Sequence, residues 1–130
     1  MNYTTTLERL RANHACTRGY DLIANHVERD FTGDIPLLTI LEVNGLDDCI
    51  WAFRATDGGL ELSVRFAIAC AMRGVKDAAW VAWAEKWLSG EDRTAAAAWA
   101  AEAARAAWAA WAAWAAERNK QVEILRELLK

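Results

Sequence analysis

Few residues of this 130-residue chain have the types and spacing that chemistry needs. His14 and Cys16 offer a nitrogen and a sulfur ligand two positions apart, but His26 is the only other histidine and no second pair matches them. A zinc site would need distant carboxylates, and a Cys–His nucleophile pair would lack a group to orient it. We therefore predict no metal site and no catalytic pair here, and we expect both side chains to be buried structural groups.

Two adjacent carboxylates, Asp47 and Asp48, are the second candidate for chemistry. Neighbouring side chains on a helix point about 100° apart, which suits paired acid–base catalysis poorly. We expect one of them, Asp47, to cap a helix and the other to be solvated. The run Asp57-Gly58-Gly59 predicts a turn, because no phosphate-binding glycine pattern is present. The sequence thus predicts no catalytic residue, no cofactor and no enzyme activity.

Composition narrows the class of protein. Fifteen Lys and Arg against 18 Asp and Glu give a formal charge of -3, without the basic excess of a nucleic-acid binder. Hydrophobic residues make up 55%, which argues against disorder, and one Pro with seven Gly leaves little material for a β-sandwich. Three cysteines without a close pair predict reduced, mostly buried thiols in the cytoplasm. The polar N-terminus predicts no signal peptide.

Helix signals follow one another along residues 1–90. Thr5 and Thr6 are N-cap candidates, Thr5 with the capping-box spacing to Glu8, and Leu7 and Leu10 then share a face of the first helix. No window alternates with a period of two, so no strand is predicted. The fold class is all-α, a small multi-helix domain with a long C-terminal Ala/Trp-rich helix. Further short helices are expected at 17–28, capped by Thr17, at 36–43, stopped by Asn44-Gly45, and at 47–55. Another is expected at 60–73, with Leu62, Phe66, Ala69 and Cys70 or Met72 facing inward, and one more at 76–88, with Trp80, Trp83 and Trp87 at spacings of three and four.

The C-terminal segment is predicted to be one long helix. Residues 92–130 contain no Gly or Pro, and residues 95–116 hold 16 Ala and four Trp. Alanine is the best helix former, and such a helix would span about 55 Å. We divide the single predicted domain, residues 1–130, into short helices over 1–90 and this long helix over 91–130.

An apolar stripe runs along one face of this helix, opposite a face marked by Glu and Arg. The stripe either packs on the protein's own helices or forms a homo-oligomer or partner surface. A membrane span is disfavoured because Glu102 and Arg105 interrupt the apolar run. The predicted interaction residues are Trp99, Trp108, Trp111, Trp114 and Leu125, and the stripe continues through Val122 and Leu129.

The length of this helix favours self-association. A compact remainder of 90 residues has a diameter of about 30 Å and would leave part of a helix of about 55 Å uncovered. We therefore predict a homo-oligomer, most simply a dimer. Two alternatives stay open: the helix breaks near Asn119 and folds back, or the short N-terminal helices pack along it end to end.

Two sets of segments resemble known sequences. Residues 7–20 (LERLRANHACTRGY), 35–48 (IPLLTILEVNGLDD) and 51–56 (WAFRAT) resemble an N-terminal module of small bacteriophage and prophage proteins of unknown role. Residues 65–73 (RFAIACAMR) and 82–91 (AWAEKWLSGE), with the Ala/Trp repeats, are similar to helical phage proteins loosely labelled immunity proteins. The connection between Arg73 and Ala82 is shorter here than in that family, which inserts an acidic, Pro-containing loop. The family offers no catalytic residues to carry over, so the resemblance implies a phage setting rather than a mechanism.

These observations together favour a non-enzymatic protein–protein interaction module. Residues 1–50 carry four basic and eight acidic side chains, and an acidic surface can mimic nucleic acid toward a basic groove. With the resemblance, we expect a phage-encoded accessory protein that binds and inhibits a host defence complex, of the anti-CRISPR kind, in the host cytoplasm, without direct nucleic-acid or membrane binding. The alternatives are a toxin–immunity protein or a protein that binds a nucleotide signal, with Arg54, Arg65 and Arg73 toward its phosphates.

Overall fold

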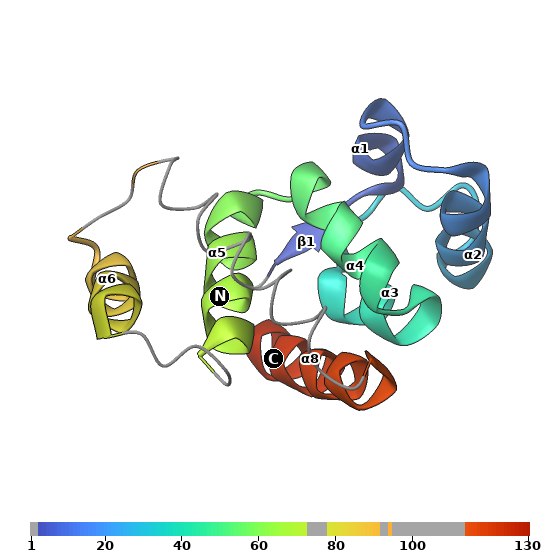
Figure 1. Cartoon of the computed structure of the whole chain (residues 1–130). Helices are drawn as coiled ribbons and strands as arrows, with labels where there is room; N and C mark the ends of the chain where they lie inside the picture. Colours follow the sequence, from blue (N-terminus) through green and yellow to red (C-terminus); the bar gives the residue numbers. More distant parts are fainter. Residues whose placement is uncertain (1–2, 73–77, 92–93, 95–113) are drawn as a thin grey trace. The chain divides into compact units, whose positions relative to one another are not determined.

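The computed structural model describes residues 3–72, 78–91, 94 and 114–130. Within these residues the chain is all-α apart from one pair of very short strands (Figure 1). The fold class is therefore as predicted. The chain divides into two compact units. The N-terminal unit comprises Met1–Leu60 with Leu125–Lys130, and the second unit comprises Glu61–Ile124. That residues 1–130 form one domain stays a prediction.

The first two helices begin at residues whose side chains cap them. Helix α1 (Leu7–Ala12) follows Thr6, whose Oγ1 accepts a hydrogen bond from the Arg9 amide at 3.1 Å, so the cap is Thr6 and the capping box predicted from Thr5 does not form. Helix α2 (Thr17–Val27) follows Cys16, whose Sγ accepts from the Gly19 amide at 3.4 Å. Thr17 was predicted to be this cap and is instead the first helical residue.

The next two helices meet at a single glycine. Helix α3 (Leu37–Asn44) ends and helix α4 (Leu46–Ala52) begins at Gly45, which has a φ of +94°. Only glycine adopts this left-handed backbone without strain, which allows the sharp turn between the helices. The prediction that Asp47 caps this helix is wrong, because Gly45 holds the cap position and no side chain caps α4. A 3₁₀ turn, η1 (Phe53–Ala55), continues α4 to the end of the predicted helix.

Two short strands pair within the N-terminal unit, contrary to the prediction of no strand. Strand β1 (Thr4–Thr5) pairs antiparallel with β2 (Ile35–Pro36), with Thr4 opposite Pro36 and Thr5 opposite Ile35. A strand of two residues is too short to show an alternating pattern in the sequence. The buried hydroxyl of Thr5 donates to the Ala55 carbonyl at 2.6 Å and so ties β1 to η1.

The second unit contains helices α5 (Gly59–Ala71), shared at its first two residues with the N-terminal unit, and α6 (Ala78–Ser89). Of the predicted inward positions, Leu62, Phe66 and Cys70 are buried, Ala69 is half-buried and Met72 is exposed. The tryptophans of α6 lie at the core between α5 and α6, with Trp87 buried in it and Trp80 and Trp83 packed against it. The core cluster that joins the two helices comprises Val64, Ala67, Ile68, Ala84 and Trp87.

Helix α8 (Trp114–Leu129) confirms the helical prediction for the end of the chain. Leu125 and Leu129 are buried, and Glu123 and Glu127 are exposed, as the stripe predicts. The buried face is rotated from the predicted one, however, because it includes Glu117 and Gln121. Gln121 Nε2 donates to Glu117 Oε1 at 3.1 Å, which satisfies polar atoms on a buried face.

The rest of the predicted long helix lies largely outside the described residues. Trp99, Trp108 and Trp111 are outside them, and Trp114 begins α8 with its side chain outside the description. The predicted dimer through this helix therefore stays a prediction. No helix among the described residues has the length and apolar character needed to cross a membrane.

Candidate functional site

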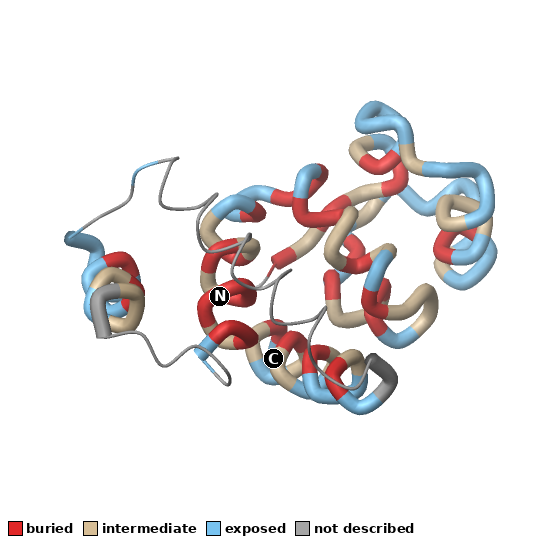
Figure 2. Tube along the Cα trace, in the orientation of Figure 1, coloured by how far each residue is buried: buried red, intermediate tan, exposed pale blue. Residues whose placement is uncertain are grey.

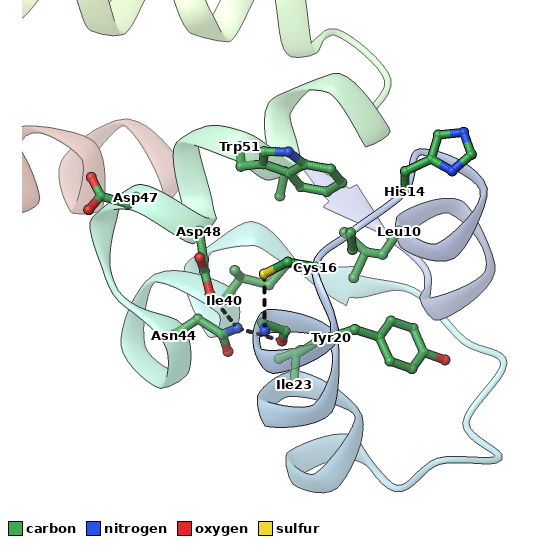
Figure 3. A pocket seen from close by; sticks show the side chains of 13 residues that line it. Leu10, His14, Cys16, Tyr20, Ile23, Ile40, Asn44, Asp47, Asp48 and Trp51 are labelled. Atoms are coloured by element: carbon green, nitrogen blue, oxygen red, sulfur yellow. Dashed lines mark hydrogen bonds between the residues drawn. The ribbon is translucent and has the colours of Figure 1, made fainter.

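A cavity of about 300 Å³ opens in the N-terminal unit among α2, α3, α4 and the connection from α1 (Figure 3). We call it the α2–α4 pocket. Its polar lining comes from Cys16, Asn44 and Asp48, with His14, Tyr20 and Asp47 toward the outside. Its apolar lining residues are Leu10, Ala15, Ile23, Ile40, Trp51 and Ala52.

The connection from α1 to α2 places Cys16 in the pocket. His14 adopts a φ of +65°, and the Ala15 amide donates to the Leu10 carbonyl at 3.0 Å, so the chain turns back over the end of α1. The connection is largely exposed (Figure 2). Figure 3 shows the Cys16 thiol among the lining side chains, whereas the His14 imidazole points away from them.

His14 and Cys16 thus depart from the sequence prediction. Both are exposed rather than buried, because the connection that carries them lies on the surface instead of continuing a helix. Cys49 and Cys70 are buried, as expected for most of the thiols. Desolvation raises the pKa of the Cys49 thiol to about 12, so that this group is a neutral core residue at physiological pH.

One asparagine links the three helices around the pocket. The Asn44 Nδ2 group donates to the Gly19 carbonyl at 2.8 Å and to Asp48 Oδ2 at 3.0 Å. Both partners are acceptors, which fixes the orientation of the amide and leaves its buried Oδ1 without a donor among the described residues. Gly19 is closely packed here, because a Cβ on it would lie 2.9 Å from Asp48 Oδ2 and 3.3 Å from Cys16 Sγ. The hydrogen bond from Asn44 holds the Asp48 carboxylate over Gly19, on the side where the Cys16 thiol also lies.

The pocket carries negative charge. Its lining includes the carboxylates of Asp47 and Asp48, and none of the described residues that line it is Lys or Arg. Asp48 is half-buried, and its side-chain donor within the described structure is Asn44. Asp47 is exposed, and its carboxylate points away from the other labelled side chains in Figure 3. The two acids therefore do not converge as a catalytic pair, and Asp48 supplies the charge inside.

Arg54, the one arginine of the N-terminal unit that was predicted to face phosphates, does not line this pocket. Arg54 lies 4.7 Å from the Trp51 ring centroid and donates to the Trp51 carbonyl at 3.0 Å. Arg65 pairs with Glu61 on α5 at 2.9 Å, and Arg73 is outside the described residues. The pocket thus has no built phosphate site in the described parts of the chain.

A smaller hollow of about 230 Å³ adjoins α1, α2 and residues 30–32. Its two arginines already have partners, since Arg29 pairs with Asp21 at 3.0 Å and Arg11 donates to the Tyr20 hydroxyl at 2.6 Å. Across the described ranges, no three His, Cys, Asp or Glu side chains gather as a metal site.

The sequence prediction and the pocket overlap only in part. Four residues were considered for chemistry from the sequence, and all of them line the pocket: His14, Cys16, Asp47 and Asp48. They do not form the metal site, the Cys–His pair or the carboxylate pair that was considered. Asn44 and Trp51 were not singled out for the site, and no local pattern marks them as site residues. Of the predicted interaction residues, Leu125 is fully buried. Comparisons with protein-family models, curated proteins and solved structures find no match to this chain.

Proposed function

We propose that this chain is a non-enzymatic interaction protein that inhibits a host protein complex by binding it. The α2–α4 pocket is the observation that supports this proposal, as the docking point for one anchoring side chain of the partner. Such interfaces concentrate their binding energy in a few side chains seated in apolar pockets. The setting, a phage-encoded protein acting in the host cytoplasm, rests on the sequence resemblance alone.

The lining of the pocket favours binding over catalysis. Apolar walls with a few placed polar groups are typical of recognition sites. The one thiol in the pocket, Cys16, has the His14 imidazole pointing away from it, and the Asp47 carboxylate points away as well (Figure 3). A nucleophilic thiol donates a hydrogen bond to its base, whereas the Cys16 Sγ accepts one from the Gly19 amide. No hydrogen bond joins this thiol to Asp48 in the described residues, and Asp48 Oδ2 accepts from Asn44 instead.

Charge supports a protein partner over a nucleotide signal. The acidic excess of residues 1–50 attracts a basic surface and speeds encounter with it. A nucleotide would bring phosphates beside Asp48 into a pocket without Lys or Arg lining. The toxin–immunity alternative uses the same mode of binding and differs in the identity of the partner.

Two substitutions at one position test the proposal. Cys16→Phe fills the mouth of the pocket, whereas Cys16→Ser keeps a side-chain acceptor for the Gly19 amide and leaves the pocket open. Each chain is expressed in bacteria that carry defence systems, and the plating efficiency of sensitive phages is measured together with capture of host proteins.

We expect the wild type and Cys16→Ser to raise plating efficiency and to capture the same complex, and Cys16→Phe to do neither. Circular dichroism of all three chains checks that each is folded. Intact host defence with every chain and no captured partner would contradict the proposal, as would full activity of folded Cys16→Phe. A thermal shift with nucleotides that Cys16→Phe abolishes would favour the nucleotide alternative.

A further inference from the structure

We infer that the α2–α4 pocket receives a lysine or arginine side chain from a basic segment of the partner, with the Asp48 carboxylate as its acceptor. This inference rests on the proposed function and specifies the chemistry of the docking group. Three features support it: the open hydrogen-bonding capacity of Asp48, the apolar walls around this carboxylate, and the lack of Lys or Arg among the described lining residues.

Asp48 is held in place while part of its hydrogen-bonding capacity remains open. Asn44 Nδ2 donates to Oδ2 at 3.0 Å, and no side chain of the described residues donates to Oδ1. The same asparagine also donates to the Gly19 carbonyl at 2.8 Å, so the acceptor is anchored to α2 and α3 as well as to its own helix. A half-buried carboxylate gains most from a charged donor, because a charge-assisted hydrogen bond is about twice as strong as a neutral one.

The surroundings of Asp48 suit an aliphatic stem that ends in a positive group. The carboxylate lies beside the Cys16 thiol, since both approach Gly19 within 3.4 Å of a Cβ built there. Ile40 and Trp51 supply apolar walls nearby (Figure 3). Lysine and arginine bury their methylene stems against such walls while the head group reaches a polar partner. A carboxylate or phosphate group would instead meet like charge.

A side chain of a protein fits better than a free ligand. The cavity of about 300 Å³ lies at the lower limit of the usual range for small-molecule sites, roughly 300–1,000 Å³. It is large enough for one long side chain, and the acidic excess of residues 1–50 complements a basic segment around that side chain.

Cys16 provides the reporter for the test, because it is the exposed one of the chain's three cysteines. The rate at which Ellman's reagent modifies the full chain is measured with heptapeptides of sequence Gly-Leu-Ala-X-Ala-Leu-Gly, capped at both ends. X is lysine, its uncharged analogue norleucine, or glutamate. Free n-pentylamine, which carries the lysine head group without a peptide, forms a separate arm.

The matched variants are Asp48→Asn and Asp34→Asn. The first removes the charge and keeps an oxygen that accepts from Asn44 Nδ2, so the pocket stays assembled. The second removes the same charge from an exposed position outside the pocket lining. We expect the lysine peptide to protect Cys16 best, and Asp48→Asn to weaken its protection about tenfold, the effect of one charge-assisted hydrogen bond. Asp34→Asn should leave it unchanged.

Several outcomes would overturn the inference. These are no protection by any probe, equal protection by the norleucine peptide, an equal effect of the two Asp variants, and protection by pentylamine without protection by the lysine peptide. The last would assign the pocket to a free amine. If Cys16→Phe loses inhibition while Asp48→Asn keeps it fully, the proposed function stands and the cationic anchor fails. If the lysine peptide binds through Asp48 while Cys16→Phe still inhibits, the proposed function fails instead.

Discussion

The three cysteines should differ sharply in reactivity when the chain is folded. Cys16 is exposed at the pocket, whereas Cys49 and Cys70 are each 0% exposed. Only the thiolate attacks a disulfide reagent, so both ionisation and access decide the rate. We therefore expect Ellman's reagent to modify one thiol per folded chain in a fast phase, and the other two only after the chain opens.

The size of the difference follows from the burial of Cys49. Its pKa of about 12 leaves roughly one thiol in 10,000 ionised at pH 8. An ordinary cysteine, with a pKa of 9.0, has roughly one thiol in ten ionised at this pH. Ionisation alone therefore slows the reaction of Cys49 by about a thousandfold relative to an ordinary thiol. Exclusion of the reagent from the core slows it further.

The assay follows the release of the coloured thiol product with time, first in buffer and then in denaturant. The expected count is one fast equivalent in buffer and three in denaturant, and Cys16→Ser should show none and two. A second fast equivalent in buffer, or a fast phase that persists in Cys16→Ser, would refute the assigned burial. Near-complete protection of all three thiols without any ligand would refute an open pocket.

Three further predictions concern the stability of the N-terminal unit, each measured by urea denaturation. Thr5→Val keeps the shape of the side chain but removes the donor to the buried Ala55 carbonyl, at an expected cost of about 1–3 kcal/mol; an unchanged midpoint would contradict this. Gly59→Ala places a Cβ against the Phe53 carbonyl oxygen and should destabilise by about 1–3 kcal/mol or more, so wild-type stability would contradict that packing. The pKa of the Cys49 thiol is 9.0 in the unfolded chain and about 12 in the folded one, so the unfolded state loses its proton first as the pH rises. The free energy of unfolding therefore falls over this interval, by about 2 kcal/mol at pH 10.5. Cys49→Ala should lack this contribution, and an identical alkaline loss in both chains would contradict the burial.

Local signals predicted much of the helical framework. The helix after Thr6 and the stop at Asn44-Gly45 lie where the sequence places them, because caps and glycines act within a few residues. Two N-caps were predicted wrongly. Cys16 is the N-cap of α2 in place of Thr17, and Gly45 is the N-cap of α4 in place of Asp47. A thiol is a weak acceptor and is not among the preferred capping groups, so the pattern gave no signal for Cys16.

The orientation of α8 and the short strands depend on contacts that the sequence does not display. Periodicity indicated an apolar face and correctly included Leu125. It did not indicate that Glu117 and Gln121 lie on the buried face, because a pattern of apolar residues assigns polar side chains to the exposed face. The pairing of β1 with β2 joins residues some thirty positions apart and has no local pattern.

Some of the residues that line the pocket could be picked out in the sequence, but their assembly into one site could not be predicted. Cys16 and Asp48 were noted for their chemistry, yet Cys16 caps α2 and Asp48 lies on α4, and they meet only through the packing of α2, α3 and α4. Asn44 joins Asp48 to the Gly19 carbonyl of α2, and the sequence shows this residue only as part of a helix stop. The sequence thus shows which polar and reactive side chains the protein has, whereas the tertiary structure decides which of them come together.

The proposal that the α2–α4 pocket is the docking point is tested most directly by closing it chemically in the otherwise unchanged protein. N-Ethylmaleimide attaches to Cys16 in the folded chain and fills the mouth of the pocket, while the buried Cys49 and Cys70 remain unmodified. The measurement is capture of the host complex by treated and untreated chains, with treated Cys16→Ser as the control. We predict that treatment abolishes capture by the wild type and leaves capture by Cys16→Ser intact. Undiminished capture by the fully modified wild type would contradict the account.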